Sequence, residues 1–317
     1  MAIQTKVGKA FEYALTVTLY NKINNGQNVK LEKNTQFQTA KSAFEGSSKL
    51  EQAKYLGSAK KAIDYVVKLE PLLENPISGE EITITIQSDQ KGGIGDIRDV
   101  VATRKKLGWE IGFSAKNNHS AVKHSRLSDK IDFGKEWFGI PCSQDYMNNV
   151  KIVFGELRQL IKGSKVQGKT LMWKDIPKKK QKIYNQILDF FEKELSQIIS
   201  KNKTAPELLL KYLIGKTDFY KIMSFKNRTL IQGFNLNNNL NQVSNSVHPA
   251  TKITKLKLPT KIDAFERKRG TTLEVRFDEG WQLSLRIHNA SSRVEPSLKF
   301  DIQLNGVPSS LFTHSEF

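Results

Sequence analysis

Apolar residues recur at two different spacings along this chain, and the two spacings alternate in blocks. A period near 3.6 residues, typical of amphipathic helices, predicts helices over residues 8–23, 40–74, most of 146–200, and 205–215. A period of two, typical of half-buried strands, predicts strands over residues 81–87, 96–104, 109–116, 272–277, 281–288 and 298–304. The asparagine-rich stretch 235–246 has neither period and is expected to be a loop or linker.

This alternation predicts an α/β (α+β) protein, with a mixed central sheet flanked by helices. We expect a core with helical insertions over residues 1–235. A β-rich C-terminal portion is expected over residues 247–317, after the loop or linker at 235–246. The strands over 96–104 and 109–116 are separated by a tight turn, so they are expected to pair as a hairpin at the centre of the core.

The composition narrows the class of protein. The chain has 317 residues and a single cysteine, which excludes a disulfide framework and a multi-cysteine zinc module and fits a reducing compartment. No apolar run approaches the ~20 residues that span a bilayer. Glu12 interrupts the apolar N-terminal stretch, so a signal peptide is not expected either. We therefore expect a cytoplasmic protein without membrane association.

The net charge of +18 favours a polyanionic partner. Nucleic acid is the leading candidate, because an excess of lysine and arginine attracts the phosphate backbone. A lysine-rich proteome would also give a basic protein, so charge by itself favours DNA only modestly.

The hairpin carries the most informative side chains. Strand alternation places Glu110, Ser114 and Lys116 on one face, and the preceding strand brings Asp96 and Asp99 within reach of that face. Carboxylates hold a hard cation such as Mg²⁺, and a nearby lysine can orient water and stabilise charge on a phosphate. The pattern suits a metal-dependent phosphodiesterase, while a salt-bridged sheet edge would show the same spacing.

A polar run follows Lys116 and suits a phosphate-lined groove. Its candidate DNA-binding residues are Asn117, Asn118, His119, Lys123, His124 and Arg126. The alternative is a solvated helix start. The two histidines and Cys142 match no zinc spacing, so histidines that face DNA or are satisfied locally are the preferred interpretation.

Several long blocks, in the same order along the chain, resemble the HaeIII-type restriction endonuclease family. They read GKAFEYAL, GDIRDVV, WEIGFSAKNNHSAVKHSRLS, DFGKEWFGIPCSQDY and WQLSLRIHNASSRVEPSLKFDIQL, within residues 7–308. The resemblance implies a type II restriction endonuclease of the PD-(D/E)xK nuclease superfamily that cuts double-stranded DNA at GGCC, between G and C, with blunt ends. It also implies Mg²⁺ dependence and a companion cytosine methyltransferase. Residues 1–235 then become the nuclease core, and 247–317 the DNA-recognition portion.

Carried over residue by residue, the resemblance makes Asp99 the first acid, with Asp96 and then Asp89 as alternatives. Lys116 is the superfamily lysine. Ser114 departs from the pattern, because the superfamily usually has an acid two residues before this lysine, and a hydroxyl is a poor Mg²⁺ ligand. The missing carboxylate is expected from Glu110 on the same strand or from Glu12 on the first helix. Asp99, Lys116 and Glu12 are the preferred set, and Asp99 and Glu12 the expected metal ligands.

Base reading is expected from the segment RIHNASSR, through Arg286, His288, Asn289 and Arg293. The alternative is a polar strand end. A palindromic site usually matches a two-fold protein, so we expect a homodimer, with a monomer as the alternative. Rival functions are another nuclease of the same fold, in repair or junction resolution, and a DNA-binding protein without catalysis.

Overall fold

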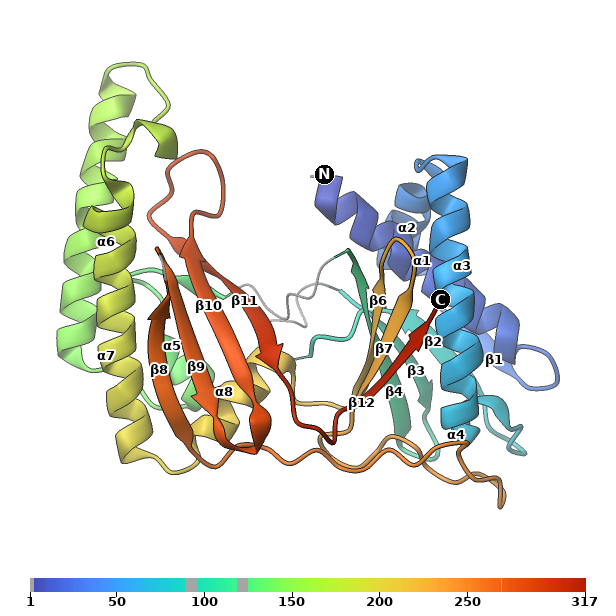
Figure 1. Ribbon diagram of the computed structural model, residues 1–317. Helices are drawn as coiled ribbons and strands as arrows, with labels where there is room; N and C mark the ends of the chain where they lie inside the picture. The colour runs from blue at the N-terminus through green and yellow to red at the C-terminus, as the bar shows by residue number, and fades with distance from the viewer. Residues whose placement is uncertain (1–2, 89–95, 119–124, 269) are drawn as a thin grey trace. The chain divides into compact units, whose positions relative to one another are not determined.

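The computed structural model describes the chain in four stretches, residues 3–88, 96–118, 125–268 and 270–317. The chain forms two compact units (Figure 1). The first unit comprises Met1–Ser120, Gly215–Lys257 and Ser310–Phe317, and the second comprises Ala121–Ile214 and Leu258–Ser309. The chain thus passes between the units repeatedly, and the helical insertions expected within the core belong to the second unit.

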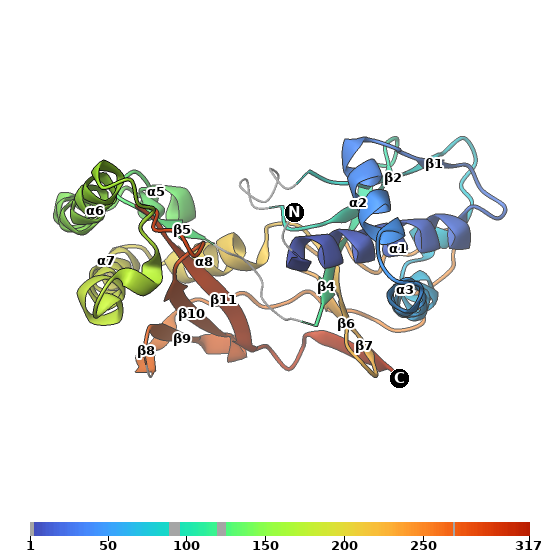
Figure 2. The same cartoon turned by 90° about the horizontal axis from the view of Figure 1, so that it is seen from above.

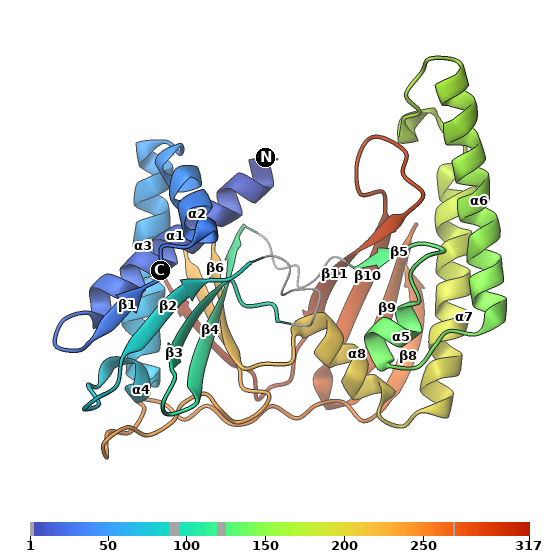
Figure 3. The same cartoon turned by 180° about the vertical axis from the view of Figure 1, so that it is seen from behind.

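A seven-stranded sheet in the order β1-β2-β3-β4-β6-β7-β12 forms the centre of the first unit (Figures 1 and 3). Its strands are β1 (Val29–Leu31), β2 (Ile82–Ile86), β3 (Val100–Arg104), β4 (Trp109–Asn117), β6 (Phe219–Ser224), β7 (Thr229–Phe234) and β12 (Phe312–Glu316). The β1–β2 and β4–β6 pairs are parallel, and the other neighbours are antiparallel. The expected mixed central sheet is confirmed.

Helices of the first unit cover one face of this sheet. They are α1 (Ile3–Ile23), α2 (Thr35–Glu45), α3 (Lys49–Leu69) and α4 (Pro71–Glu74). Helix α1 contacts β2, β3 and β4, and α3 contacts β6 and β7; the two helices cross and pack against each other (Figure 2). Alternate strand residues such as Ile84, Ile111 and Tyr220 are buried together with Phe11 and Leu15 of α1 in one core. The apolar side chains of β2 and β4 lie on the face that packs on this core, which explains the period of two in their sequence.

The single helix predicted over residues 40–74 is wrong, because local capping divides it into α2, α3 and α4. Helix α2 ends at Glu45, with Gly46 as its C-cap, and Ser48 is the N-cap of α3. The side chains of Ser48 and Glu51 form a capping box, in which each accepts a hydrogen bond from the backbone N–H of the other. Both helices bury apolar residues in the same core, so the hydrophobic pattern continues across the break.

The second unit combines helices with a five-stranded antiparallel sheet in the order β5-β11-β10-β9-β8. Its strands are β5 (Arg126–Leu127), β8 (Ile262–Lys268), β9 (Thr272–Phe277), β10 (Gln282–His288) and β11 (Leu298–Gly306), and its helices are α5 (Phe133–Phe138), α6 (Gln144–Val166), α7 (Gln186–Lys201) and α8 (Ala205–Ile214). Phe133, Trp137, Phe191 and Phe300 join the helices to the sheet through ring contacts. The predicted β-rich C-terminal pattern is confirmed.

No helix in the described stretches combines the length and apolar character that a membrane span requires. The expected α+β class is therefore seen as two units, each with its own sheet and helices.

A buried carboxyl joins three parts of the first unit. Glu70 follows α3 and is fully buried, and its Oε1 accepts hydrogen bonds from Tyr220 Oη of β6 and from the backbone N–H of Asn241, both at 2.8 Å. Burial raises the pKa of Glu70 to about 8, because desolvation penalises the charged form more than these hydrogen bonds favour it. The proton on Glu70 therefore contributes to stability.

Glu70→Gln is expected to flatten the pH dependence of the unfolding free energy. The folded pKa is raised, so the contribution of Glu70 is complete below its usual value of 4.5 and is lost as the pH rises towards 8. Urea unfolding at pH values across this window should show that the unfolding free energy of the wild type falls by up to ~1.4 kcal/mol per pH unit. The variant should lack this fall. Glu74→Gln, at an exposed position on α4, should keep the wild-type slope, and equal slopes in all three proteins would contradict the assignment.

Candidate active site

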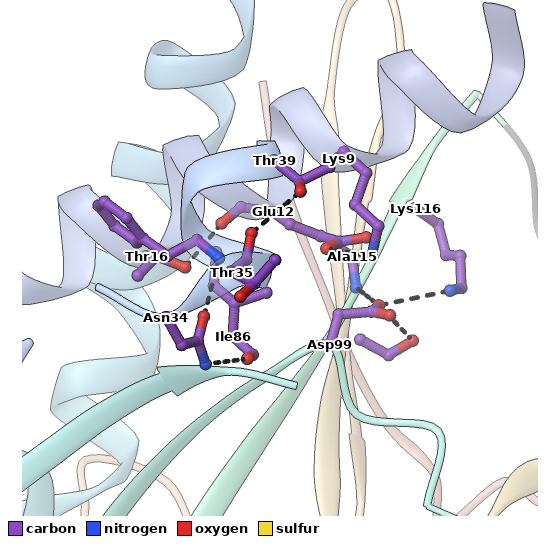
Figure 4. A network of polar contacts seen from close by, with 12 residues as sticks. Lys9, Glu12, Thr16, Asn34, Thr35, Thr39, Ile86, Asp99, Ala115 and Lys116 are labelled. Carbon is purple, nitrogen blue, oxygen red and sulfur yellow. Dashed lines mark hydrogen bonds and ion pairs between the residues drawn. The ribbon is translucent and has the colours of Figure 1, made fainter. Parts of the chain in front are cut away.

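The hairpin of β3 and β4 places an aspartate beside a lysine at one end of the first unit's sheet (Figure 4). Asp99 precedes β3 by one residue and is fixed by its backbone, whose N–H donates to Phe113 O at 2.8 Å and whose carbonyl accepts from Gln87 N at 2.9 Å. Its position therefore follows from the sheet itself and not from a flexible loop.

The Asp99 carboxylate is held by three groups of β4. Its Oδ2 accepts a hydrogen bond from the Ala115 backbone N–H at 2.7 Å, and Lys116 Nζ lies 3.5 Å from the same oxygen. The buried Ser114 hydroxyl lies 3.4 Å away. The expected juxtaposition of Asp99, Ser114 and Lys116 across the hairpin is present.

A second carboxyl comes from helix α1. Glu12 is only 6% exposed, and its Oε2 accepts from Lys9 Nζ at 3.0 Å; Figure 4 shows its carboxyl close to Asp99 and Ala115. Burial is the main reason that the pKa of Glu12 rises to about 7, and the negative charge of Asp99 raises it further, while Lys9 and Lys116 oppose the rise. A buried carboxyl and a partly exposed carboxylate thus lie close together and repel each other when both are ionised.

Asp96 and Glu110, the other acids considered for this site, are engaged elsewhere. Both bind Arg98, whose Nε lies 2.8 Å from Asp96 Oδ1 and whose Nη1 lies 2.7 Å from Glu110 Oε1. The Arg98 side chain crosses Gly112, where an added Cβ would lie 1.9 Å from Arg98 Cδ. The structure therefore does not bring these two alternative acids to the Asp99–Lys116 pair, because both neutralise a buried guanidinium.

A further lysine that the sequence analysis did not select lies on the same sheet face. Lys221 of β6 is the register partner of Ser114, and it is 3% exposed. Burial lowers its pKa to about 7, with a further contribution from the charge of Lys116. The only sequence feature that points to this residue is a single lysine within the mostly apolar segment FYKIMS, in which apolar and polar residues do not alternate.

The donor atoms of this site fit Mg²⁺. In the part of the chain that the structure describes, no group of three or more histidine, cysteine, aspartate or glutamate side chains could hold a metal ion. Mg²⁺ commonly uses only one or two protein carboxylates and completes its octahedron with water and substrate phosphate. Asp99 and Glu12 supply such a pair of oxygen ligands, and their mutual repulsion when ionised favours a cation beside them.

The polar run after Lys116 is only partly described. Asn117 ends β4, and Asn118 donates its backbone N–H to Ser224 O at 2.9 Å, at the same end of the sheet. The other expected residues of this run and one alternative acid lie outside the described residues; they are His119, Lys123, His124 and Asp89.

Five of the expected DNA-binding residues that the structure describes belong to the second unit, where most of them have partners within the protein. Arg126 Nη1 lies 3.3 Å from Glu295, and Arg286 Nη2 lies 2.8 Å from Asp301 on the neighbouring strand. Asn289 accepts from Tyr184 Oη at 3.0 Å, and His288 Nδ1 lies 2.7 Å from the Asn289 carbonyl. Arg293 is exposed and has no ion pair with a described residue.

Several cations of the basic segment 252–276 are also paired with acids in the structure. Arg267 binds Asp189 and Glu192 of α7, and Lys268 and Arg276 both bind Glu266. These ion pairs reduce the positive charge that this segment offers to a polyanion.

Known proteins of one family resemble this chain over nearly its whole length. A family model described as HaeIII restriction endonuclease matches residues 8–308. The chain is 40% identical to the "Type II restriction enzyme HaeIII" of Haemophilus aegyptius over 309 residues, which are 96% of this chain and 95% of the relative. No solved structure matches the chain. With a match over nearly its whole length, the chain belongs to the HaeIII restriction endonuclease family.

Proposed function

We propose that this type II restriction endonuclease hydrolyses double-stranded DNA at GGCC, between G and C, with blunt ends and with Mg²⁺ as cofactor. The observation that carries the catalytic part is the Asp99–Lys116 pair on a sheet hairpin with Glu12 beside it. The recognition sequence rests on the resemblance to the family, since no described side chain identifies a base.

Asp99 and Glu12 are the proposed metal ligands, and Glu12 takes the place of the acid that Ser114 lacks. A bound Mg²⁺ would supply a nucleophilic water at neutral pH and neutralise charge on the scissile phosphate. The Ala115 N–H holds the Asp99 carboxylate in place, so its orientation does not depend on the ligand.

Lys116 is the proposed catalytic cation. Its ammonium group can orient the attacking water and stabilise the negative charge that develops on the phosphate. The Lys116 ammonium group lies 3.5 Å from Asp99 Oδ2, and this ion pair directs the lysine towards the proposed metal ligand. Lys221 adds a second basic group on the same face.

The partners follow from this activity. Double-stranded DNA is the substrate, and the net charge of +18 favours its binding. A companion methyltransferase would protect host GGCC sites without forming a stable complex, and both enzymes would act in the cytoplasm. We propose a homodimer, because two-fold symmetry lets each copy cut one strand of a palindrome; sedimentation of the DNA-bound protein would reveal a monomer instead.

A digest of unmethylated plasmid with Mg²⁺, followed by mapping of the ends, tests the proposal. Discrete fragments with blunt ends between G and C are expected, and the same plasmid methylated at GGCC should stay intact. A random smear would indicate a nonspecific nuclease, cutting only at branched DNA would indicate a junction-resolving enzyme, and binding without cleavage would indicate a DNA-binding protein.

Lys116→Ala is expected to lower kcat by roughly 10²–10⁴-fold while DNA affinity changes little, because the lysine acts on charge that develops during the reaction. Single-turnover cleavage and gel-shift binding would measure the two effects separately. Lys105→Ala, an exposed lysine in the turn between the same strands, is the matched control and should cleave normally. Equal losses in both variants would count against a catalytic Lys116.

Glu12→Gln is expected to raise the Mg²⁺ concentration needed for half-maximal cleavage and to remove its pH dependence. The pKa of Glu12 is about 7, so Mg²⁺ must displace a proton below that pH, and the wild-type requirement should rise up to ~10-fold per pH unit as the pH falls. Magnesium titrations of the cleavage rate at several pH values measure this. Glu45→Gln, at an exposed position on α2, should behave as wild type. A pH-independent wild-type requirement would exclude Glu12 as a ligand.

A further inference from the structure

The turn between β6 and β7, residues 225–228, lies at the same end of the strands as the candidate active site. Strand β6 is parallel to β4, with Lys116 opposite Met223 and Asn117 opposite Ser224. Both strands therefore end together, and the hydrogen bond from Asn118 N to Ser224 O extends the pairing by one step. Figure 1 shows this turn at the end of the sheet where β4 also ends.

Three consecutive polar residues are exposed in this turn: Lys226, Asn227 and Arg228. Neither cation forms an ion pair with another described residue, whereas Lys41 on α2 and Lys60 on α3 are each paired with an acid on the same helix. Two unneutralised positive charges beside an active site that must receive a polyanion create a local attraction for phosphate.

The arginine of the turn is oriented before any ligand binds. Its guanidinium lies over the Phe225 ring, 5.4 Å from the ring centroid. A guanidinium on an aromatic face keeps its N–H groups available at its edge, and holding it there reduces the entropy lost when it binds an anion. Lysine in the same place would lack this planar fork.

A shallow hollow of about 420 Å³ lies beside these side chains. Its lining residues are Asn118, Phe225, Lys226, Asn227, Arg228 and Phe317. Side-chain amides, two cations and two aromatic rings thus line the hollow. One of the lining residues, Asn118, follows Lys116 by two positions in the sequence. Phosphate oxygens of a nucleic-acid backbone accept hydrogen bonds from lysine, arginine and asparagine side chains of this kind.

We propose that the turn 225–228 is a phosphate-binding element that holds the duplex backbone next to the scissile phosphate, through Lys226 and Arg228. This assignment rests on the proposed function, because it takes DNA as the ligand and the Asp99–Lys116 pair as the place of cleavage. Contacts of this kind position the backbone and carry no sequence information. The turn would then fix the register of the scissile phosphate while base reading is done elsewhere.

The test compares the double variant Lys226→Ala/Arg228→Ala with wild type in binding to a short GGCC duplex and to an unrelated duplex, without Mg²⁺, at several salt concentrations. Each lost phosphate contact should reduce the slope of log K against log[salt] by about 0.9, so the double variant should be flatter by about 1–2. Affinity should fall by the same factor for both duplexes. With Mg²⁺, the variant should still cut between the same bases.

Lys105→Ala/Lys106→Ala is the matched control. It removes the same charge from the turn at the opposite end of the same sheet, and its salt slope should equal that of wild type. Equal flattening in both double variants would assign the effect to overall charge and overturn the proposal, as would an unchanged slope in the 225–228 variant. A loss confined to the GGCC duplex would make the turn a base reader and overturn it too.

Two further measurements distinguish misfolding of the double variant, and an error in the proposed recognition sequence, from an error in the proposed phosphate contact. Lys226→Ala alone leaves Arg228 on the Phe225 ring and should still flatten the slope by about 0.9, which covers the case in which the double variant is poorly folded. Wild-type protein that neither prefers nor cuts the GGCC duplex would refute the proposed recognition sequence, while the salt slopes would still test whether residues 225–228 bind phosphate.

Discussion

The hydrogen bond from the Ala115 backbone N–H to the Asp99 carboxylate is the contact on which the site depends. It joins the segment before β3 to β4, and it places the two neighbours of Ala115 around the same carboxylate oxygen, with Ser114 at 3.4 Å and Lys116 at 3.5 Å. A main-chain donor cannot change rotamer, so the carboxylate is preorganised by the sheet. Two-residue side-chain alternation then directs Ser114 and Lys116 to the same face.

Charge in the first unit is divided between structure and function. Arg98 uses Asp96 and Glu110, so these acids stabilise a buried guanidinium next to the site and leave Asp99 to face Lys116. Glu12 is brought in by the packing of α1, whose apolar residues occupy the core beneath it. The pKa of Glu12 is raised because burial, and then the nearby charge of Asp99, disfavour its ionised form. A divalent cation bound beside both carboxylates would favour the ionised form again.

Much of the fold and part of the site could be predicted from sequence. Periodicity gave the β3–β4 hairpin, the first helix and most of the second unit's strands, and the Asp99–Lys116 pair followed from two strands close in sequence. Strands β6 and β7 were missed. All six residues of β6 are buried, so its sequence has no alternation between apolar and polar positions. The division of the 40–74 helix depended on the Ser48 cap, a local signal weaker than the hydrophobic pattern around it.

The sequence by itself determined the class of elements, the single-face chemistry of β4, the departure at Ser114 and the family of the protein, because these are local patterns or long stretches of matching residues. Only the tertiary structure decided which charges meet. The parallel pairing of β4 with β6 brings Lys221 and the turn 225–228 to the end of the sheet where Lys116 lies, although they are about a hundred residues apart in sequence. Arg98 binds Asp96 and Glu110 and so keeps them away from Lys116. Helix α1 contributes the Glu12 carboxyl in place of the acid that β4 lacks at Ser114. Such choices depend on long-range packing, and periodicity in the sequence records which face is buried but not which partner covers it.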